Sequence, residues 1–329
     1  MACCLGVASR RGGEGGRGRF RLIRQFIDYD TTETHGICPQ GLVTVESQGR
    51  DRVRANDPEM KVFYSPKQSV AYNDSFSPSA GKPALLVAQW QERWPDRLVF
   101  VEPEPVSVEQ FSLAHDRKFV EDILHCRKPN GFGNRSAEVA ASLPWTTGSL
   151  VSAVESVLEH GGAACSPTSG FHHSGYAYAR AFCTFNGLMV GAMTAAERVS
   201  RVGILDCDYH YGDGTDDIIR LREIDYVSHL TTGNLSCGSE EFLDSLSDSL
   251  SEMKPDILIY QAGADAHLDD PLGGWMTTEQ MRRRDRLVFE FCRDEGVPVV
   301  WNLAGGYQNE IQRVLDLHHA TMEECLNCF

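Results

Sequence analysis

Two carboxylates and an imidazole follow an apolar segment, residues 202–205, in the stretch RVGILDCDYHYGDGT. Asp206, Asp208 and His210 alternate along the chain, so an extended backbone places their side chains on one side. An unpaired buried charge is costly, so acids at the end of a buried strand need a partner. Carboxylates and imidazoles bind divalent cations, and three protein ligands with one position left for water are typical of catalytic zinc. The stretch therefore predicts metal-assisted chemistry.

Other apolar segments also lead into polar or aromatic residues. One precedes AGAD, which ends in Asp265, and another precedes AGGYQ, which contains Tyr307. The segment SPTSGFHHSG places His172 and His173 in tandem before an apolar helical pattern. A lone Asp at the end of a strand is more often a turn or helix cap. Reactive groups of α/β proteins gather beyond the carboxyl ends of the strands. The occurrence of such residues after several apolar segments of this chain therefore favours a common site.

Continuous apolar runs that alternate with helical patterns predict the elements that position these residues. Such a pattern is typical of an α/β protein with a mostly parallel central sheet and helices on both faces. We expect strands at residues 61–65, 98–103, 202–206, 226–230, 256–262 and 297–303. We expect helices at residues 83–94, 107–124 (in short pieces), 147–161, 185–199, 241–253, 278–296 and 310–326.

Composition excludes several classes of protein. The chain has 329 residues, of which 42% are hydrophobic, and this is enough to bury a large core. No apolar run approaches the roughly 20 residues that span a bilayer, so we expect no membrane association. The net charge of −15 argues against a nucleic acid partner, which would need a basic face. Eleven scattered cysteines indicate reduced thiols and a cytoplasmic location.

Residues 1–59 differ from the rest of the chain. The stretch RRGGEGGRGRFR is rich in Gly and Arg, and the polar residues after it lack hydrophobic periodicity. We expect residues 1–59 to be a disordered leader or a non-native N-terminal extension, with an organelle-targeting segment as an alternative. Residues 60–329 are then expected to form a single catalytic domain.

Several of these segments together resemble one enzyme family. SGFHHSG, FCTFNG, DCDYHYGDGT, AGADAHLDDPLGG and LAGGY are similar, in this order, to segments of zinc-dependent deacetylases. These are the histone deacetylases, acetylpolyamine amidohydrolases and acetoin-utilisation proteins. VFYSP and AHDRKFVEDIL extend the resemblance from about Met60 to the C-terminus. The resemblance implies a three-layer arginase/deacetylase-like fold, with the active site at the C-terminal ends of the strands.

The resemblance also implies a metal centre and a pair of catalytic histidines. One Zn²⁺ per chain would be held by Asp208, His210 and Asp265. His173 would act as the general base and acid, and His172 would stabilise the transition state electrostatically.

Further residues receive supporting roles from the same resemblance. Asp206 would orient His172, and Asp213 would orient His173. Tyr307 would donate its hydroxyl to the developing oxyanion. Phe182 and Leu272 would line the substrate channel. A departure from the family pattern is Ala181, which stands where a glycine usually precedes the channel phenylalanine.

A potassium ion near the zinc is a further implication of the resemblance. Its candidate ligands are the backbone carbonyls of Asp206, Asp208 and His210, together with Ser228.

The implied function is a zinc-dependent amidohydrolase that deacylates a small acylated amine, such as an acetylpolyamine, or an acyl-lysine. Zinc-bound water would attack the amide. The chain could act as a monomer or as a homo-oligomer, and the sequence leaves both open. A di-manganese ureohydrolase of the same fold is a second hypothesis, for which Asp269 offers a further carboxylate, although the HH loop lacks the aspartates it needs. A catalytically silent binding module is the third, because a fold does not by itself imply a function.

Overall fold

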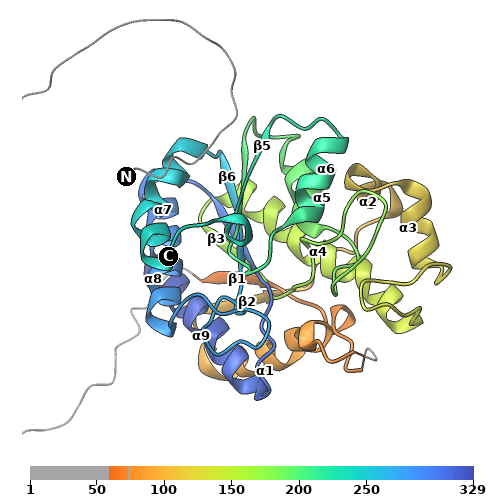
Figure 1. Cartoon of the computed structure of the whole chain (residues 1–329), viewed down its shortest axis with the longest axis horizontal. Helices are drawn as coiled ribbons and strands as arrows, with labels where there is room; N and C mark the ends of the chain where they lie inside the picture. Colours follow the sequence, from red (N-terminus) through yellow and green to blue (C-terminus); the bar gives the residue numbers. More distant parts are fainter. Residues whose placement is uncertain (1–58, 73–74) are drawn as a thin grey trace, which may run out of the picture. The chain divides into compact units, whose positions relative to one another are not determined.

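A seven-stranded sheet lies at the centre of the computed structural model, which describes residues 59–72 and 75–329. All the strands are parallel, in the order β2-β1-β3-β7-β6-β4-β5. Figure 1 shows the sheet between helices on either side. The strands are β1 (Met60–Phe63), β2 (Leu98–Val101), β3 (Ala163–Ser166), β4 (Val202–Asp206), β5 (Val227–Thr231), β6 (Ile257–Ala262) and β7 (Val299–Leu303). The predicted disordered leader or extension falls on residues 1–59, which lie outside the described residues apart from Glu59.

Helices connect successive strands over most of the described chain. The α-helices are α1 (Lys82–Arg93), α2 (Val108–Ala114), α3 (Arg117–Leu124), α4 (Ala137–His160), α5 (Gly187–Ala195), α6 (Asp213–Leu221), α7 (Ser239–Met253), α8 (Thr278–Glu295) and α9 (Ile311–Cys328). Short 3₁₀-helices are η1 (Pro66–Gln68), η2 (Pro78–Ala80) and η3 (Thr232–Asn234). None of these helices is both long and apolar enough to cross a membrane.

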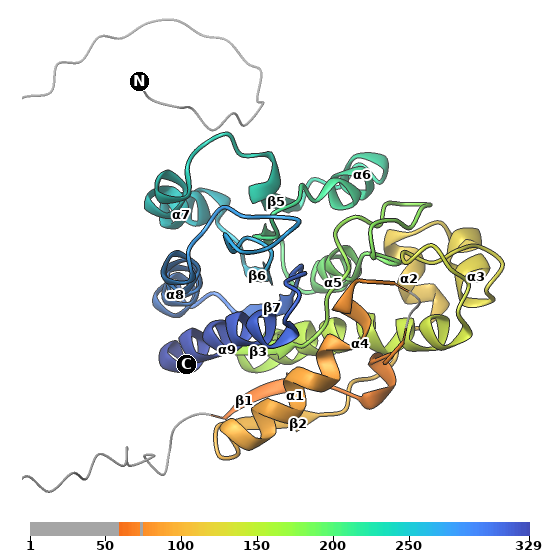
Figure 2. The ribbon, with the colours of Figure 1, turned by 60° about the horizontal axis from the view of Figure 1, so that its bottom comes forward.

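The helices form a layer on each face of the sheet (Figure 2). α1, α7, α8 and α9 pack on one face, where Trp90, Leu246 and Val288 are fully buried. α2 to α6 pack on the other, where Leu150 and Leu188 are fully buried. Burying one such side chain stabilises the fold by about 1.5–3 kcal/mol, so each layer is held mainly by apolar contact. The three-layer α/β arrangement is confirmed.

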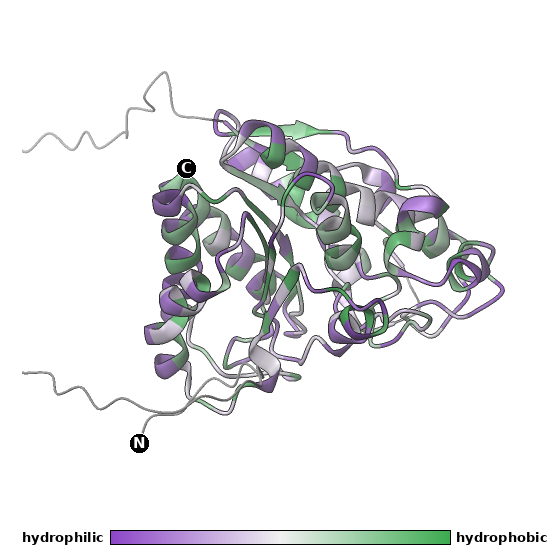
Figure 3. Cartoon of the chain, turned by 90° about the horizontal axis from the view of Figure 1, so that it is seen from above, coloured by the Kyte–Doolittle hydropathy of each residue, from purple (hydrophilic) through white to green (hydrophobic). Residues whose placement is uncertain are grey.

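The central strands are buried on both faces. Every residue of β4, β6 and β7 is buried, which explains why these strands appear in the sequence as continuous apolar runs. Figure 3 shows hydrophobic segments along the sheet, whereas hydrophilic residues occur on the outer turns of the helices. Because the strands are parallel, all their carboxyl ends lie at one edge of the sheet, and their loops can form one site there.

Two elements were not predicted from the sequence. β3 has only four residues, AACS, and lacks the β-branched residues that favour strands, yet it lies between β1 and β7. α6 begins at Asp213, inside the segment YGDG, where no helix was predicted. α4 also begins at Ala137, ten residues before the predicted start, and it contains Pro144. In each case tertiary contacts outweigh a weak local signal.

Candidate active site and metal centre

The three predicted metal ligands meet at the carboxyl ends of β4 and β6. Asp208 and His210 follow β4, and Asp265 follows β6, which pairs with β4 in parallel. One donor atom from each residue lies within 4.8 Å of the other two. His210 Nδ1 is 3.1 Å from Asp208 Oδ1 and 3.0 Å from Asp265 Oδ2. The neighbouring strands thus bring together residues that are more than fifty positions apart in the chain.

The charges at this site are those that a divalent cation would balance. Asp208 and Asp265 are 3% and 0% exposed. Burial raises the pKa of Asp265, and the negative charge of Asp208 raises it further. A cation with two positive charges would offset both carboxylates, which otherwise repel each other in a region of low dielectric constant. Two carboxylate oxygens and one imidazole nitrogen also match the donor atoms that Zn²⁺ accepts, so the residues present fit this ion.

Two histidine–carboxylate pairs lie beside these ligands. His172 Nδ1 is 2.8 Å from Asp206 Oδ2, and His173 Nδ1 is 2.6 Å from Asp213 Oδ1. The two imidazole ring centres are 4.0 Å apart. Arg180 donates a hydrogen bond to the second carboxylate oxygen of Asp213. A carboxylate at Nδ1 can fix the tautomer and the orientation of each ring.

The environments of the two histidines separate their protonation states. Burial alone would lower the pKa of His172, but the charges of Asp206 and Asp208 raise it to about 9. Burial, and then the charge of His172, lower the pKa of His173. Without a bound cation, His172 is therefore the more basic of the two rings and His173 the less basic. Such a separation of two neighbouring pKa values is typical of an acid–base pair.

Tyr307 reaches the same site from the loop after β7. Gly306 has a φ of +105°, a conformation that side chains rarely adopt. A Cβ atom on Gly305 would lie 2.1 Å from Asp265 Cγ, so only glycine allows this close approach. The Gly305 amide donates to Asp208 Oδ2 at 2.9 Å. Burial raises the pKa of Tyr307, so its hydroxyl keeps the proton that a hydrogen-bond donor needs.

Two residues that were not predicted hold this loop in place. The Lys82 ammonium donates to the carbonyl oxygens of Ala304 and Gly305, each at 2.6 Å. Asp270 Oδ2 accepts a hydrogen bond of 2.7 Å from the Tyr307 amide. Lys82 is 1% exposed, and burial lowers its pKa to about 8, which leaves it mostly protonated at neutral pH. In the sequence, Lys82 looks like any lysine at the start of a helix.

We predict that Lys82→Met lowers kcat more than it raises KM. The variant leaves two buried carbonyls without their charged donor, and the Tyr307 loop should move as a result. A displacement of about 1 Å at reacting groups can cost roughly a hundredfold in rate, so we expect a loss of about tenfold to a hundredfold. Steady-state kinetics would test this, with Lys67→Met as a control because the Lys67 side chain is 58% exposed. An unchanged kcat would contradict a positioning role for Lys82.

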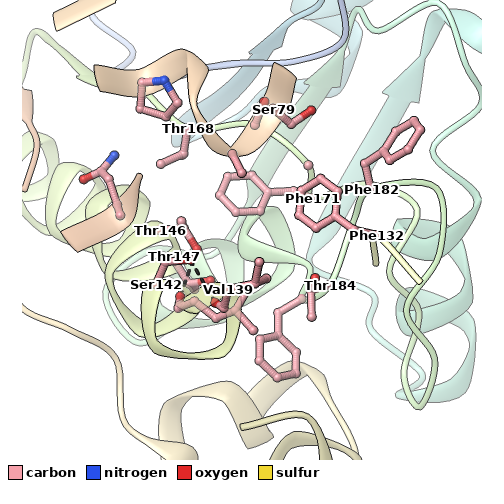
Figure 4. A pocket seen from close by; sticks show the side chains of 17 residues that line it. Ser79, Phe132, Val139, Ser142, Thr146, Thr147, Thr168, Phe171, Phe182 and Thr184 are labelled. Carbon is pink, nitrogen blue, oxygen red and sulfur yellow. Dashed lines mark hydrogen bonds between the residues drawn. The ribbon is translucent and has the colours of Figure 1, made fainter. Parts of the chain in front are cut away.

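A hollow of about 250 Å³ beside the metal ligands is lined by His172, Asp208, Phe182 and Tyr307, among others. It adjoins a second hollow of about 500 Å³, and Ser79, Gly170 and Phe182 line both. Figure 4 shows hydroxyl groups and phenyl rings around the second hollow, including the predicted channel residue Phe182. The first hollow thus includes the metal ligand Asp208, and the second extends from Phe182 to further aromatic residues such as Phe132 and Phe171.

The aromatic partner of Phe182 was not predicted. The Phe76 ring centre lies 5.2 Å from that of Phe182 and 6.3 Å from that of Tyr307, although Phe76 is 74% exposed. Leu272 was expected to line the channel. It is 41% exposed and is not among the described residues that line the two hollows. The three aromatic rings thus form a cluster at one side of the first hollow, which Phe182 and Tyr307 line.

Ala181 and Phe182 have left-handed backbone conformations, with φ of +46° and +66°. We predict that Ala181→Gly stabilises the protein, because a Cβ atom in this region costs about 1–2 kcal/mol. Glycine loses more backbone entropy on folding, so the net gain in the free energy of unfolding should be about 0.5–1 kcal/mol. Urea denaturation measures this gain directly. A destabilised variant would show that the turn carries no such strain.

The structure does not bring together all the candidate potassium ligands. Asp206 pairs with Thr231, whereas Ser228 pairs with Gly203, three residues earlier on β4. This places Ser228 about 10 Å along the strand from the end where Asp206 lies. The Ser228 residue is also exposed. The prediction of Ser228 as a ligand is therefore corrected.

Comparison with known proteins shows to which protein family the chain is related. A sequence profile described as the histone deacetylase domain matches residues 80–229 and 233–322. An uncharacterised protein of Picosynechococcus sp. is 31% identical over 257 residues, which cover 66% of this chain and 84% of that protein. Histone deacetylase 2 of Arabidopsis thaliana is 30% identical over 175 residues, which cover 44% of each.

A solved structure shows the same fold. The acetylpolyamine aminohydrolase from Burkholderia pseudomallei superposes with a TM-score of 0.63 at 19% identity, covering 81% of this chain and 98% of that one. The likeness confirms the predicted deacetylase-like fold. The profile extends over most of the chain and includes the candidate metal ligands, both histidines and Tyr307. The chain therefore belongs to the histone deacetylase domain family.

Proposed function

We propose that this chain is a zinc-dependent amidohydrolase that removes the acyl group from a small acylated amine or from acyl-lysine. The observation that carries the proposal is the meeting of Asp208, His210 and Asp265, whose donor atoms lie within 4.8 Å of one another. Two histidine–carboxylate pairs and a tyrosine lie around the same point. Membership of a deacetylase family supports the same chemistry.

Amide hydrolysis requires a nucleophile, a stabilised oxyanion and a proton for the leaving amine. Zn²⁺, when bound by Asp208, His210 and Asp265, would act as a Lewis acid and lower the pKa of a water molecule to about 7. His173 would take a proton from the attacking water at Nε2 and then give it to the nitrogen of the leaving amine. The products are a carboxylate and a free amine.

His172 and Tyr307 would stabilise the charge that develops on the substrate. A protonated His172 would provide a positive charge 4.0 Å from the His173 ring, measured between ring centres. The Tyr307 hydroxyl would donate a hydrogen bond to the carbonyl oxygen as this atom gains negative charge. Preorganised donors of this kind typically contribute about 10²–10³-fold each to the rate.

The hollow beside Asp208 suits a linear acylated amine. Phe182 and Tyr307 line it, and Phe76 packs against both rings; aromatic walls favour an apolar stem over a branched or charged one. The relatives include proteins named for histone deacetylation and for acetylpolyamine hydrolysis, and both substrates have such a stem. We therefore propose the acyl-amine stem as the recognised feature.

A di-manganese ureohydrolase is the less favoured function. In residues 59–72 and 75–329, a single cluster of three or more metal-ligating residues was found. The Asp269 side chain is 62% exposed, and its Oδ2 lies 3.9 Å from His267 Nδ1. Asp269 therefore faces away from the cluster that a second manganese ion would have to share.

A hydrolysis screen tests the proposal. Acetylpolyamines, acetyl-lysine peptides and longer acyl-lysines would be incubated with the metal-loaded chain, with and without a hydroxamate that chelates zinc. We expect release of free amine and carboxylate from at least one class, and suppression by the hydroxamate. A protein that binds metal and hydrolyses none of these compounds would favour the binding module. Urea release with two manganese ions per chain would favour the ureohydrolase.

A further inference from the structure

Arg284 of α8 is a buried residue that contacts both of the loops that carry the carboxylate metal ligands. It is 0% exposed, and its Nη1 donates to the carbonyl oxygen of Gly263 at 3.0 Å and to that of Cys207 at 3.4 Å. Cys207 directly precedes Asp208, and Gly263 lies two residues before Asp265. One guanidinium group therefore joins the two loops next to their metal ligands.

The two loops also contact each other where Arg284 reaches them. The Cys207 amide donates to the Gln261 carbonyl oxygen at 3.0 Å, which extends the pairing of β4 with β6. A Cβ atom on Gly263 would lie 2.4 Å from Asp208 Cα and 2.5 Å from the Cys207 carbonyl oxygen. The backbone of Gly263 therefore packs directly against that of Asp208, and the Arg284 donor lies at the same contact.

A buried carboxylate fixes the position of this guanidinium group. Arg284 Nε donates to Asp285 Oδ1 at 2.8 Å. The Tyr260 hydroxyl donates to the same oxygen, and the Thr321 hydroxyl donates to Asp285 Oδ2 at 2.6 Å. All four residues are buried, and they come from α8, β6 and α9. The guanidinium group is thus held by contacts from three elements of the fold.

Stability alone is a weak reason for a buried ion pair. Removing two charges from water is costly, and apolar residues of similar volume often stabilise a core as well or better. An apolar side chain could not donate to the carbonyl oxygens of Cys207 and Gly263, whereas the planar guanidinium group of arginine donates in several fixed directions. The contacts of Arg284 with the metal-binding loops therefore supply what an apolar core would lack.

We propose that Arg284 is a positioning residue, which fixes the separation of Asp208 and Asp265 and so tightens the binding of the divalent cation. Two neighbouring carboxylates repel each other in a region of low dielectric constant. A contact that holds their loops together favours the geometry that the cation requires. This role rests on the metal centre of the proposed function, but it does not depend on hydrolysis.

Zinc affinity, measured without any substrate, tests this role. Arg284→Met/Asp285→Asn removes the guanidinium donor and leaves no buried carboxylate without its partner. We expect the dissociation constant for Zn²⁺, from competition with a chromophoric chelator, to rise about tenfold to a hundredfold, the usual effect of removing a group that supports metal ligands. The melting temperature of the metal-free protein should be measured on the same preparation. A lower melting temperature with unchanged zinc affinity would show a purely structural role and would overturn the proposal.

Glu324→Gln is the matched control for a general effect of removing a buried charge. Glu324 is a buried residue of α9 that pairs with Arg282 of α8 at 2.6 Å and with Arg286 at 3.0 Å. We expect this variant to have a lower melting temperature and to retain the zinc affinity of the unmodified chain. A loss of zinc affinity as large as that of the double variant would contradict a specific role for Arg284.

Arg284→Lys keeps the proposal testable if the double variant does not fold. Lysine retains a positive charge beside Asp285, but its compact ammonium group cannot reproduce the planar arrangement that joins the carboxylate to both carbonyls. We expect zinc affinity to fall in this variant as well, and an unchanged affinity would count against the proposal. These outcomes are independent of turnover: a chain that shows the expected changes in zinc affinity yet hydrolyses no acyl-amine would refute only the proposed function.

Discussion

His173→Ala is expected to keep its metal and to lose about 10²–10⁴-fold of its hydrolysis rate, the usual contribution of a general acid–base group. His173 is not one of the three metal ligands. Its Nδ1 atom instead lies 2.6 Å from Asp213 Oδ1, which holds the ring. Burial and the neighbouring His172 lower the pKa of His173, which keeps it free to accept a proton at neutral pH. Its removal should therefore affect proton transfer and leave the metal in place.

Metal content and kinetics should be measured on the same preparation. His160→Ala is a suitable control, because His160 lies exposed in the last turn of α4, where its Nδ1 is 2.9 Å from the Ser156 carbonyl oxygen of the same helix. The control should retain normal kcat and KM. Near-normal turnover in His173→Ala with full metal content would refute its assignment as the base.

Asp265→Ala is expected to lose the metal ion itself, and with it all measurable hydrolysis. The substitution removes one of three ligands and leaves His210 Nδ1 without the oxygen that lies 3.0 Å away. It also leaves the Tyr209 amide without its acceptor, which is Asp265 Oδ1 at 3.1 Å. An open three-ligand site cannot lose a ligand without a large fall in affinity, since no spare protein donor replaces it.

Dialysis followed by elemental analysis would measure the remaining metal per chain. Asp269→Ala is the matched control. It removes a carboxylate from the same loop, but the Asp269 side chain is 62% exposed. We expect full occupancy in Asp269→Ala and little in Asp265→Ala. Full zinc occupancy in Asp265→Ala would contradict its role as a ligand.

Much of the fold and of the site could be predicted from continuous apolar runs and the residues that follow them. β4 has the predicted bounds, and β6 differs from the prediction by one residue, because strands buried on both faces need apolar residues throughout. The residues that follow these strands favoured a common site, and the family resemblance implied Asp208 and Asp265 as metal ligands within it. β3 could not be predicted, because AACS is a strand only through its neighbours β1 and β7.

The residues that support the site could not be predicted because they act through the backbone. Lys82 and Asp270 contact a carbonyl and an amide of the Tyr307 loop, and such contacts leave no motif in the sequence. Phe76 meets Phe182 only in the folded chain. The error at Ser228 has a simple cause: moving one residue along a strand exchanges the two faces, so His229 faces inward instead.

Anomalous diffraction at the zinc absorption edge tests the central claim most directly. Crystals of the zinc-loaded chain should show one strong peak, within bonding distance of Asp208, His210 and Asp265 together. The distances should be about 2.0–2.2 Å to the carboxylate oxygens and to the imidazole nitrogen. A map with no peak between these side chains, or with two metal peaks sharing them, would contradict the account.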